Sequence, residues 1–162
     1  MTNEELLERY PFLKTDEEDK TWLDHMWDGW RKLFGIQLCE DLKEAIEHDH
    51  IQNFKIITLK EKFGKLRLIC HGGNGKDKIW EIKTAYEYIS SRTCIECGKF
   101  PVHMYDSDGY ICPHCKEHKP KYARIRDNSP AVDELKWTVE CLGEKNDYYI
   151  DLRPYYKKLG IR

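Results

Sequence analysis

Four cysteines near the middle of the chain have the spacing of a metal site. Cys94 and Cys97 form one C-x2-C pair, and Cys112 and Cys115 form a second pair further along the chain. Each short pair can fold into a tight turn that presents two sulfurs to one ion. The sequence therefore predicts one structural Zn²⁺ held by Cys94, Cys97, Cys112 and Cys115.

His118 is a fifth residue that could bind this metal. It follows Cys115 by three residues, and imidazole nitrogen is a common zinc ligand. The spacing leaves open whether His118 replaces a thiolate. We expect it to lie outside the coordination sphere, as a spare or supporting group.

The predicted metal is structural because four thiolates close the coordination sphere, whereas a hydrolytic zinc keeps one position for water. Zinc deaminases need a His-x-Glu segment, and no glutamate follows His103 in this way. HNH-type nucleases need a longer spacer between their cysteine pairs. No nucleophile–base pair or carboxylate dyad can be identified in the sequence either, so we expect no enzymatic activity.

The elements around the cysteines are those of a zinc ribbon. Residues 102–105 and 110–111 read as two short strands, and Asp108-Gly109 is a strong hairpin signal between them. We expect the ribbon to occupy about 92–118 inside one domain of residues 1–162. A chain of this length can bury about 70% of its unfolded surface, which is enough for one core.

The flanking segments predict an α+β fold: N-terminal helices, a β-hairpin, a helix, the four-cysteine zinc ribbon and a C-terminal β-hairpin. An apolar stripe at helical spacing runs from Trp22 to Trp30 and continues to Ile46, and the Asp28-Gly29 step is a point where this helix could break or restart. Alternating strands flank Gly64 and Gly143, and Gly64 is expected to turn its hairpin with a positive φ. We expect both hairpins to join one sheet. The glycine-rich stretch 71–77 does not fit a phosphate-binding loop and predicts a connector.

Charge is unevenly distributed along the chain, although the net charge is only −2. Residues 1–50 are strongly acidic and residues 51–126 are strongly basic. Such a basic portion favours an anionic partner. The candidate contact residues are Lys60, Lys62, Lys65, Arg67, Lys119, Lys121, Arg124 and Arg126.

Three motifs resemble a set of small, uncharacterised phage and prophage proteins. These are the K-E-K-F-G-x-L-R stretch at 60–67, the C-x-x-C-G knuckle at 94–98 and the Asp28-Gly29-Trp30 step. The likeness covers roughly residues 28–118. In those proteins the second knuckle reads Cys-x-x-His, whereas Cys115 stands at that histidine position here. The resemblance implies an accessory protein that acts in a bacterial cytoplasm by binding a host factor.

Together these features predict a non-enzymatic zinc-ribbon protein that binds a host macromolecule. A host protein is the favoured partner, and inhibition of a host or defence factor is one mode of action. Nucleic acid and a small anionic nucleotide signal are the alternatives. The sequence has no signal peptide and no apolar run of membrane-spanning length, so we expect a cytoplasmic protein with no membrane contact. It does not predict the oligomeric state.

Overall fold

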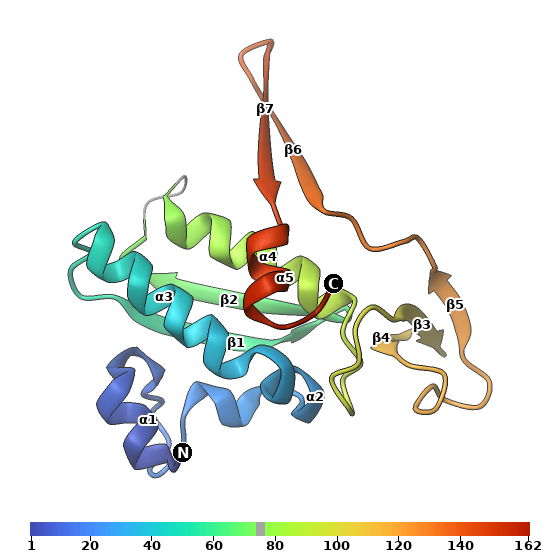
Figure 1. Ribbon diagram of the computed structural model, residues 1–162, viewed down its shortest axis with the longest axis horizontal. Helices are drawn as coiled ribbons and strands as arrows, with labels where there is room; N and C mark the ends of the chain where they lie inside the picture. Colours follow the sequence, from blue (N-terminus) through green and yellow to red (C-terminus); the bar gives the residue numbers. More distant parts are fainter. Residues whose placement is uncertain (74–76) are drawn as a thin grey trace.

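The computed structural model describes residues 1–73 and 77–162 and confirms the predicted α+β class. Residues 74–76, which belong to the predicted glycine-rich connector, lie outside the described residues. Two helices cover one face of a long β-hairpin, and a small sheet and a projecting hairpin flank this body (Figure 1). The elements are α1 (Asn3–Arg9), η1 (Pro11–Leu13), η2 (Trp22–His25), α2 (Asp28–Trp30), η3 (Arg31–Gly35), α3 (Ile36–His48), β1 (Lys55–Lys62), β2 (Lys65–His71), α4 (Lys78–Ser91), β3 (His103–Ser107), β4 (Tyr110–His114), β5 (Arg124–Asp127), β6 (Glu134–Cys141), β7 (Glu144–Asp151) and α5 (Arg153–Lys158).

The apolar stripe from Trp22 is not one continuous helix, and the helix restarts at the Asp28-Gly29 step that the sequence indicates as a possible break. Trp22–His25 forms only a 3₁₀ turn, η2, and Met26 then takes an extended backbone conformation. A second helical stretch begins at Asp28 and continues through η3 into α3. The chain therefore restarts its helix at the Asp28-Gly29 step, which turns the N-terminal segment beneath the main body.

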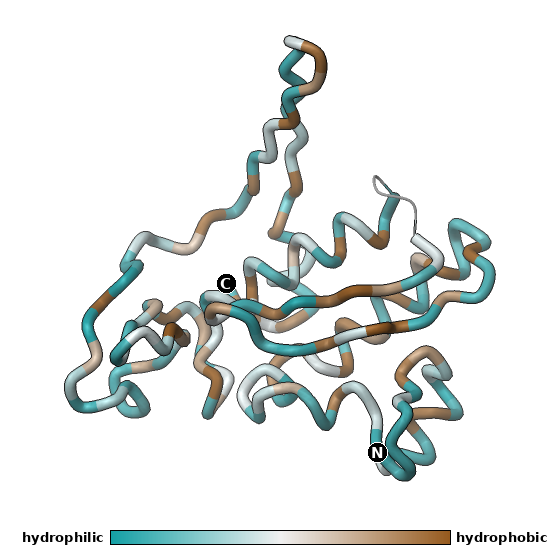
Figure 2. Tube along the Cα trace, turned by 180° about the vertical axis from the view of Figure 1, so that it is seen from behind, coloured by the Kyte–Doolittle hydropathy of each residue, from teal (hydrophilic) through white to brown (hydrophobic). Residues whose placement is uncertain are grey.

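The body is a helical layer on a two-stranded sheet. Ile56, Leu59, Leu66 and Leu68 point from β1 and β2 into the core, where α3 and α4 cover them. The opposite face of the hairpin has no covering layer among the described residues and faces the viewer in Figure 2. This open face comes from strand alternation, because every second side chain points away from the helices.

The β1–β2 turn has the left-handed backbone predicted at Gly64, where φ is +75°. A Cβ there would lie 2.6 Å from Met104 Sδ, so the turn rests directly on the small sheet. The small sheet has the order β4-β3-β5. Its third strand, β5, comes from the end of the basic run that follows the cysteines.

The two long hairpins do not share a sheet, contrary to the prediction. β1 pairs only with β2, and β6 pairs only with β7 among the described strands. The β6–β7 hairpin instead projects from the body (Figure 1). After β7 the chain returns to the helical layer as α5, where Tyr155 and Tyr156 are buried.

Candidate metal centre and its surroundings

The first knuckle is a tight turn that carries Cys94 and Cys97. Gly98 has φ +81°, its N–H donates to the Cys94 carbonyl at 3.0 Å, and the Cys94 N–H donates to the Lys99 carbonyl at 2.9 Å. A side chain at residue 98 would be strained at this φ, so glycine suits the turn. Both sulfurs consequently face the same side of the loop.

The start of the second helical stretch holds this knuckle in place. The Gly29 N–H donates to the Ile95 carbonyl at 2.8 Å, and Trp30 Nε1 donates to the Thr93 carbonyl at 3.0 Å. A Cβ on Gly29 would lie 2.1 Å from the Cys94 carbonyl oxygen. Backbone therefore packs directly on backbone here, and only glycine permits that approach.

The second pair of candidate ligands is Cys115 and His118. These residues follow the end of β4, where the His118 and Lys119 N–H groups donate to the Cys115 carbonyl at 3.2 and 3.0 Å. The turn brings His118 Nδ1 to 3.1 Å from Cys115 Sγ and 3.7 Å from Cys94 Sγ. Residues 115–118 thus form a C-x2-H knuckle facing the first one.

The four potential ligand atoms form a compact cluster. Those of Cys94, Cys97, Cys115 and His118 all lie within 4.8 Å of one another, and Cys97 Sγ is 3.9 Å from Cys115 Sγ. A tetrahedral site with Zn–S bonds of about 2.3 Å has S···S edges of about 3.8 Å. The cluster therefore fits one zinc-type ion with three cysteine ligands and one histidine ligand.

The two thiols of the first knuckle have pKa values shifted in opposite directions. Burial acts to raise the pKa of Cys94, but backbone N–H groups of Cys115, Cys97 and Glu96 point at its sulfur and lower that pKa to about 7. Burial raises the pKa of Cys97, and the adjacent sulfurs of Cys94 and Cys115 add to that effect. Crowded thiolates repel one another, and a bound divalent cation would remove that repulsion.

Cys112, which the sequence predicts as a ligand, lies outside this cluster. It pairs with Tyr105 within the β3–β4 ladder, is 1% exposed and belongs to the main hydrophobic core. Burial raises the pKa of its thiol to about 11. Because β4 continues to His114, the backbone at Cys112 is extended and cannot form the tight turn of a knuckle. In the candidate cluster, His118 stands where the sequence predicts a fourth cysteine.

The predicted cationic residues divide between two sheets. Lys60 pairs with Arg67 and Lys62 pairs with Lys65, so the hairpin brings these four cations onto its open face. The second predicted group is Lys119, Lys121, Arg124 and Arg126. These residues are exposed on β5 and the loop before it, at the far edge of the small sheet. The structure therefore assembles the first group and leaves the second apart from it.

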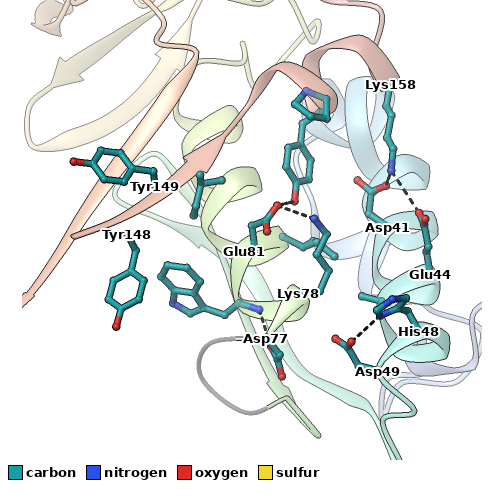
Figure 3. A pocket seen from close by; sticks show the side chains of 16 residues that line it. Asp41, Glu44, His48, Asp49, Asp77, Lys78, Glu81, Tyr148, Tyr149 and Lys158 are labelled. Carbon is teal, nitrogen blue, oxygen red and sulfur yellow. Dashed lines mark hydrogen bonds and ion pairs between the residues drawn. The ribbon is translucent and has the colours of Figure 1, made fainter. Parts of the chain in front are cut away.

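A groove with a volume of about 580 Å³ is the feature that sequence reasoning missed (Figure 3). It lies between α3, α4, β7 and α5. Asp41 is buried in one wall and accepts hydrogen bonds from Gln37 at 3.0 Å, Tyr86 at 2.7 Å and Lys158 at 2.7 Å. On the opposite wall Glu81 accepts from Lys78 and Tyr155. These bonds tie α5 to both helices, and no local pattern signals contacts so distant in sequence.

Comparison with known proteins adds no identification. No protein-family model matches the chain, and no curated protein or solved structure matches it significantly. Within the described ranges, no helix combines the length and apolar character needed to cross a membrane. The fold and the ligand cluster therefore define an α+β protein with a candidate metal centre of three cysteines and one histidine.

Proposed function

We propose that this chain is a non-enzymatic binding protein, stabilised by one structural Zn²⁺, that docks on an acidic surface of a partner protein. Cys94, Cys97, Cys115 and His118 would supply all four ligands of the ion. Four protein ligands leave no position for a reacting water, which supports a structural role. The ion would fix the small sheet against the helix start at Gly29.

The open face of the β1–β2 hairpin carries this proposal. We define the cationic face as Lys60, Lys62, Lys65 and Arg67 together with the exposed residues Ile57 and Ile69, which are 46% and 43% accessible. Like charges directly opposite each other in a sheet are unfavourable, so this arrangement costs stability in the isolated protein. Such a cost is offset when an anionic surface covers the face.

The neighbouring acids do little to neutralise the cationic face. The Glu61 carboxylate accepts the Gly64 N–H at 2.6 Å and is used within the turn. Lys65 approaches Glu87 only at 4.0 Å, and both side chains are about half exposed. Exposed ion pairs of this kind contribute little. The positive charge of the face is therefore available to a partner.

Apolar side chains among the cations favour protein over nucleic acid as the partner. A phosphate backbone offers charge and no apolar surface to Ile57 and Ile69, whereas a protein surface offers carboxylates and apolar groups together. The resemblance to phage proteins makes a bacterial host protein the natural candidate. The groove in Figure 3 has carboxylates in excess over lysines, which gives a nucleotide ligand less support.

Nucleic acid is the second candidate function, and the pairing of cations across the hairpin favours it. Lys60, Arg67, Lys62 and Lys65 form a row that a phosphate backbone could follow. Four phosphate contacts would lower duplex-DNA affinity by roughly 150-fold between 50 and 200 mM salt, from a slope of about −0.9 per phosphate. We expect no sub-micromolar binding to random DNA or RNA at 150 mM salt.

The test is affinity capture from bacterial lysate, with and without nuclease, using wild type and Lys60→Glu/Arg67→Glu. Lys32→Glu/Lys157→Glu is the matched control because both lysines are exposed, lie outside the face and change the net charge equally. We expect a nuclease-resistant partner that the control retains and the face variant loses. Loss of capture after nuclease treatment would favour nucleic acid, and equal capture by both variants would refute docking through this face.

A further inference from the structure

The β6–β7 hairpin is an arm with little support from the body (Figure 1). Its strands pair from Glu134 with Asp151 to Cys141 with Glu144, and most residues on both strands are exposed. At the base Trp80 contacts Trp137 and Tyr148, with ring centroids 6.1 and 6.5 Å apart. Beyond that contact the arm is a two-stranded ribbon, which is marginally stable alone.

The arm exposes apolar and acidic side chains together. Trp137 and Tyr149 are about half exposed, and Leu142 at the tip is fully exposed. The strand register gives the arm two faces, and Trp137 lies on the face that meets Trp80. The other face carries Tyr149 with four carboxylates and two lysines: Glu134, Glu140, Asp147 and Asp151 against Lys136 and Lys145. This second face of the arm is therefore net acidic and carries an exposed aromatic ring, which complements the positive charge and exposed isoleucines of the cationic face.

The arm and the cationic face also match in size. β6 and β7 each have eight residues, and β1 and β2 have eight and seven. Both are two-stranded ribbons, roughly 26 Å long and 10 Å wide at about 3.3 Å per residue. One ribbon can therefore cover the other along its whole length.

Within one chain the arm cannot reach its own cationic face. β7 leads into α5, and α5 is bound to the helical layer through Lys158 and Asp41 and through Tyr155 and Glu81. That layer lies on the opposite side of the β1–β2 hairpin from the open face (Figures 1 and 2). An arm that covers a cationic face must come from another molecule.

We infer that two copies of this chain form a reciprocal dimer, in which the arm of each copy lies on the cationic face of the other. The inference rests on the proposed function, because it treats that face as a docking surface and names a second copy as one occupant. Two such contacts bury on the order of 1,000 Å², the low end for a specific interface. The dimer is consequently weak, with a micromolar dissociation constant, and an acidic partner protein can compete with the arm.

Sedimentation equilibrium at several concentrations tests the dimer with two charge-reversal variants. The face variant is Lys60→Glu/Arg67→Glu, and the arm variant is Glu134→Lys/Glu140→Lys, which changes two carboxylates on the same face of the arm. The face variant has two cations and two carboxylates on that row and loses its net attraction for the arm, whereas the arm variant places a positive arm against a positive face. We therefore expect the dissociation constant to rise at least tenfold in each variant alone. In an equal mixture the unchanged arm of the face variant meets the unchanged face of the arm variant, and in the second contact the two sets of substituted residues have opposite signs. The dimer should therefore return as a heterodimer.

Recovery in the mixture is a result that misfolding of either variant would not produce. Circular dichroism spectra matching wild type would confirm that both variants fold. Wild type that remains monomeric up to millimolar concentration, or a mixture that stays as monomeric as its components, would overturn the reciprocal dimer. Either result would leave the proposed function untouched, because the capture experiment tests it separately. In that experiment the face variant must lose a captured protein that is not a second copy of this chain.

Discussion

The two C-x2-C pairs of this chain have the same sequence spacing but different structures. Cys94 and Cys97 lie on one turn, and both sulfurs belong to the ligand cluster. Cys112 and Cys115 are divided by the end of β4, so one sulfur enters the core and the other enters the cluster. The difference shows that a cysteine pair acts as a knuckle only where the backbone between its members is free to turn.

A glycine explains why the first pair forms a knuckle, and a strand explains why the second pair does not. Gly98 follows the first pair with a positive φ and completes its turn. The second pair has Pro113 and His114 between its cysteines, and both are paired with β3 in an extended ladder. The turn that the second pair lacks appears one step later, between Cys115 and His118.

The largest expected effect comes from removing a cysteine of the cluster. Cys115→Ser should lose the metal and unfold the small sheet, because structural zinc contributes about 10–16 kcal/mol in small modules, as much as a whole domain's stability. Thermal denaturation and elemental analysis measure the two effects. The matched control is Cys141→Ser on the exposed arm, which should keep both metal and melting temperature. Identical behaviour of these two variants would contradict the role given to Cys115.

The contact beneath the first knuckle should have the next largest effect. Gly29→Ala would place a Cβ 2.1 Å from the Cys94 carbonyl oxygen, and we expect it to lower the free energy of unfolding by about 3 kcal/mol. Gly35→Ala is the control, since the nearest atom there is Arg31 Cγ at 3.4 Å. Alanine in that helix should be neutral or stabilising by up to about 1 kcal/mol. Chemical denaturation measures the free energy of unfolding of both variants. An unchanged value for Gly29→Ala would contradict the close backbone contact beneath the first knuckle.

The imidazole ligand should be replaceable by another zinc ligand but not by a methyl group. His118→Ala should weaken zinc binding by more than roughly a hundredfold, beyond the 10–100-fold typical of an outer partner. His118→Cys should retain the metal in a site with four thiolate ligands, because thiolate is an equally good ligand. Competition with a chromophoric chelator measures both affinities, and unchanged binding by the alanine variant would place His118 outside the coordination sphere.

Cys112→Ala should have the smallest effect of the series. It removes one buried sulfur from the core and no metal ligand, so we expect a loss of about 1 kcal/mol and a melting temperature lower by about 2–4 °C. Scanning calorimetry of the zinc-loaded protein measures this shift. A collapse as large as that of Cys115→Ser would show that both members of the second pair bind the metal.

Much of the fold was predictable because its signals are local. The Asp108-Gly109 turn, the left-handed Gly64 and the helix restart at Asp28 all depend on neighbouring residues. The position of Cys112 in the core, outside the ligand cluster, was not predictable from neighbouring residues. It depends on how far β4 extends, and that is set by pairing with β3 and by the core beneath it.

The groove and the arm were unpredictable for a related reason. The Lys158–Asp41 bond joins residues 117 positions apart, and no periodic pattern records such a contact. The β6–β7 strands alternate like those of β1–β2, which is why a shared sheet was expected. An alternating apolar and polar pattern identifies a strand but does not determine which strand it pairs with. The second hairpin packs on Trp80 and does not pair with the first hairpin.

Zinc stoichiometry in Cys112→Ala and His118→Ala tests the central claim most directly. Both proteins should be purified without chelator, dialysed against a weak chelator and measured by native mass spectrometry with elemental analysis. A Cys94/Cys97/Cys115/His118 centre predicts one zinc per chain in Cys112→Ala and a metal-depleted His118→Ala. Zinc lost from Cys112→Ala and retained by His118→Ala would contradict that centre and restore the four-cysteine site.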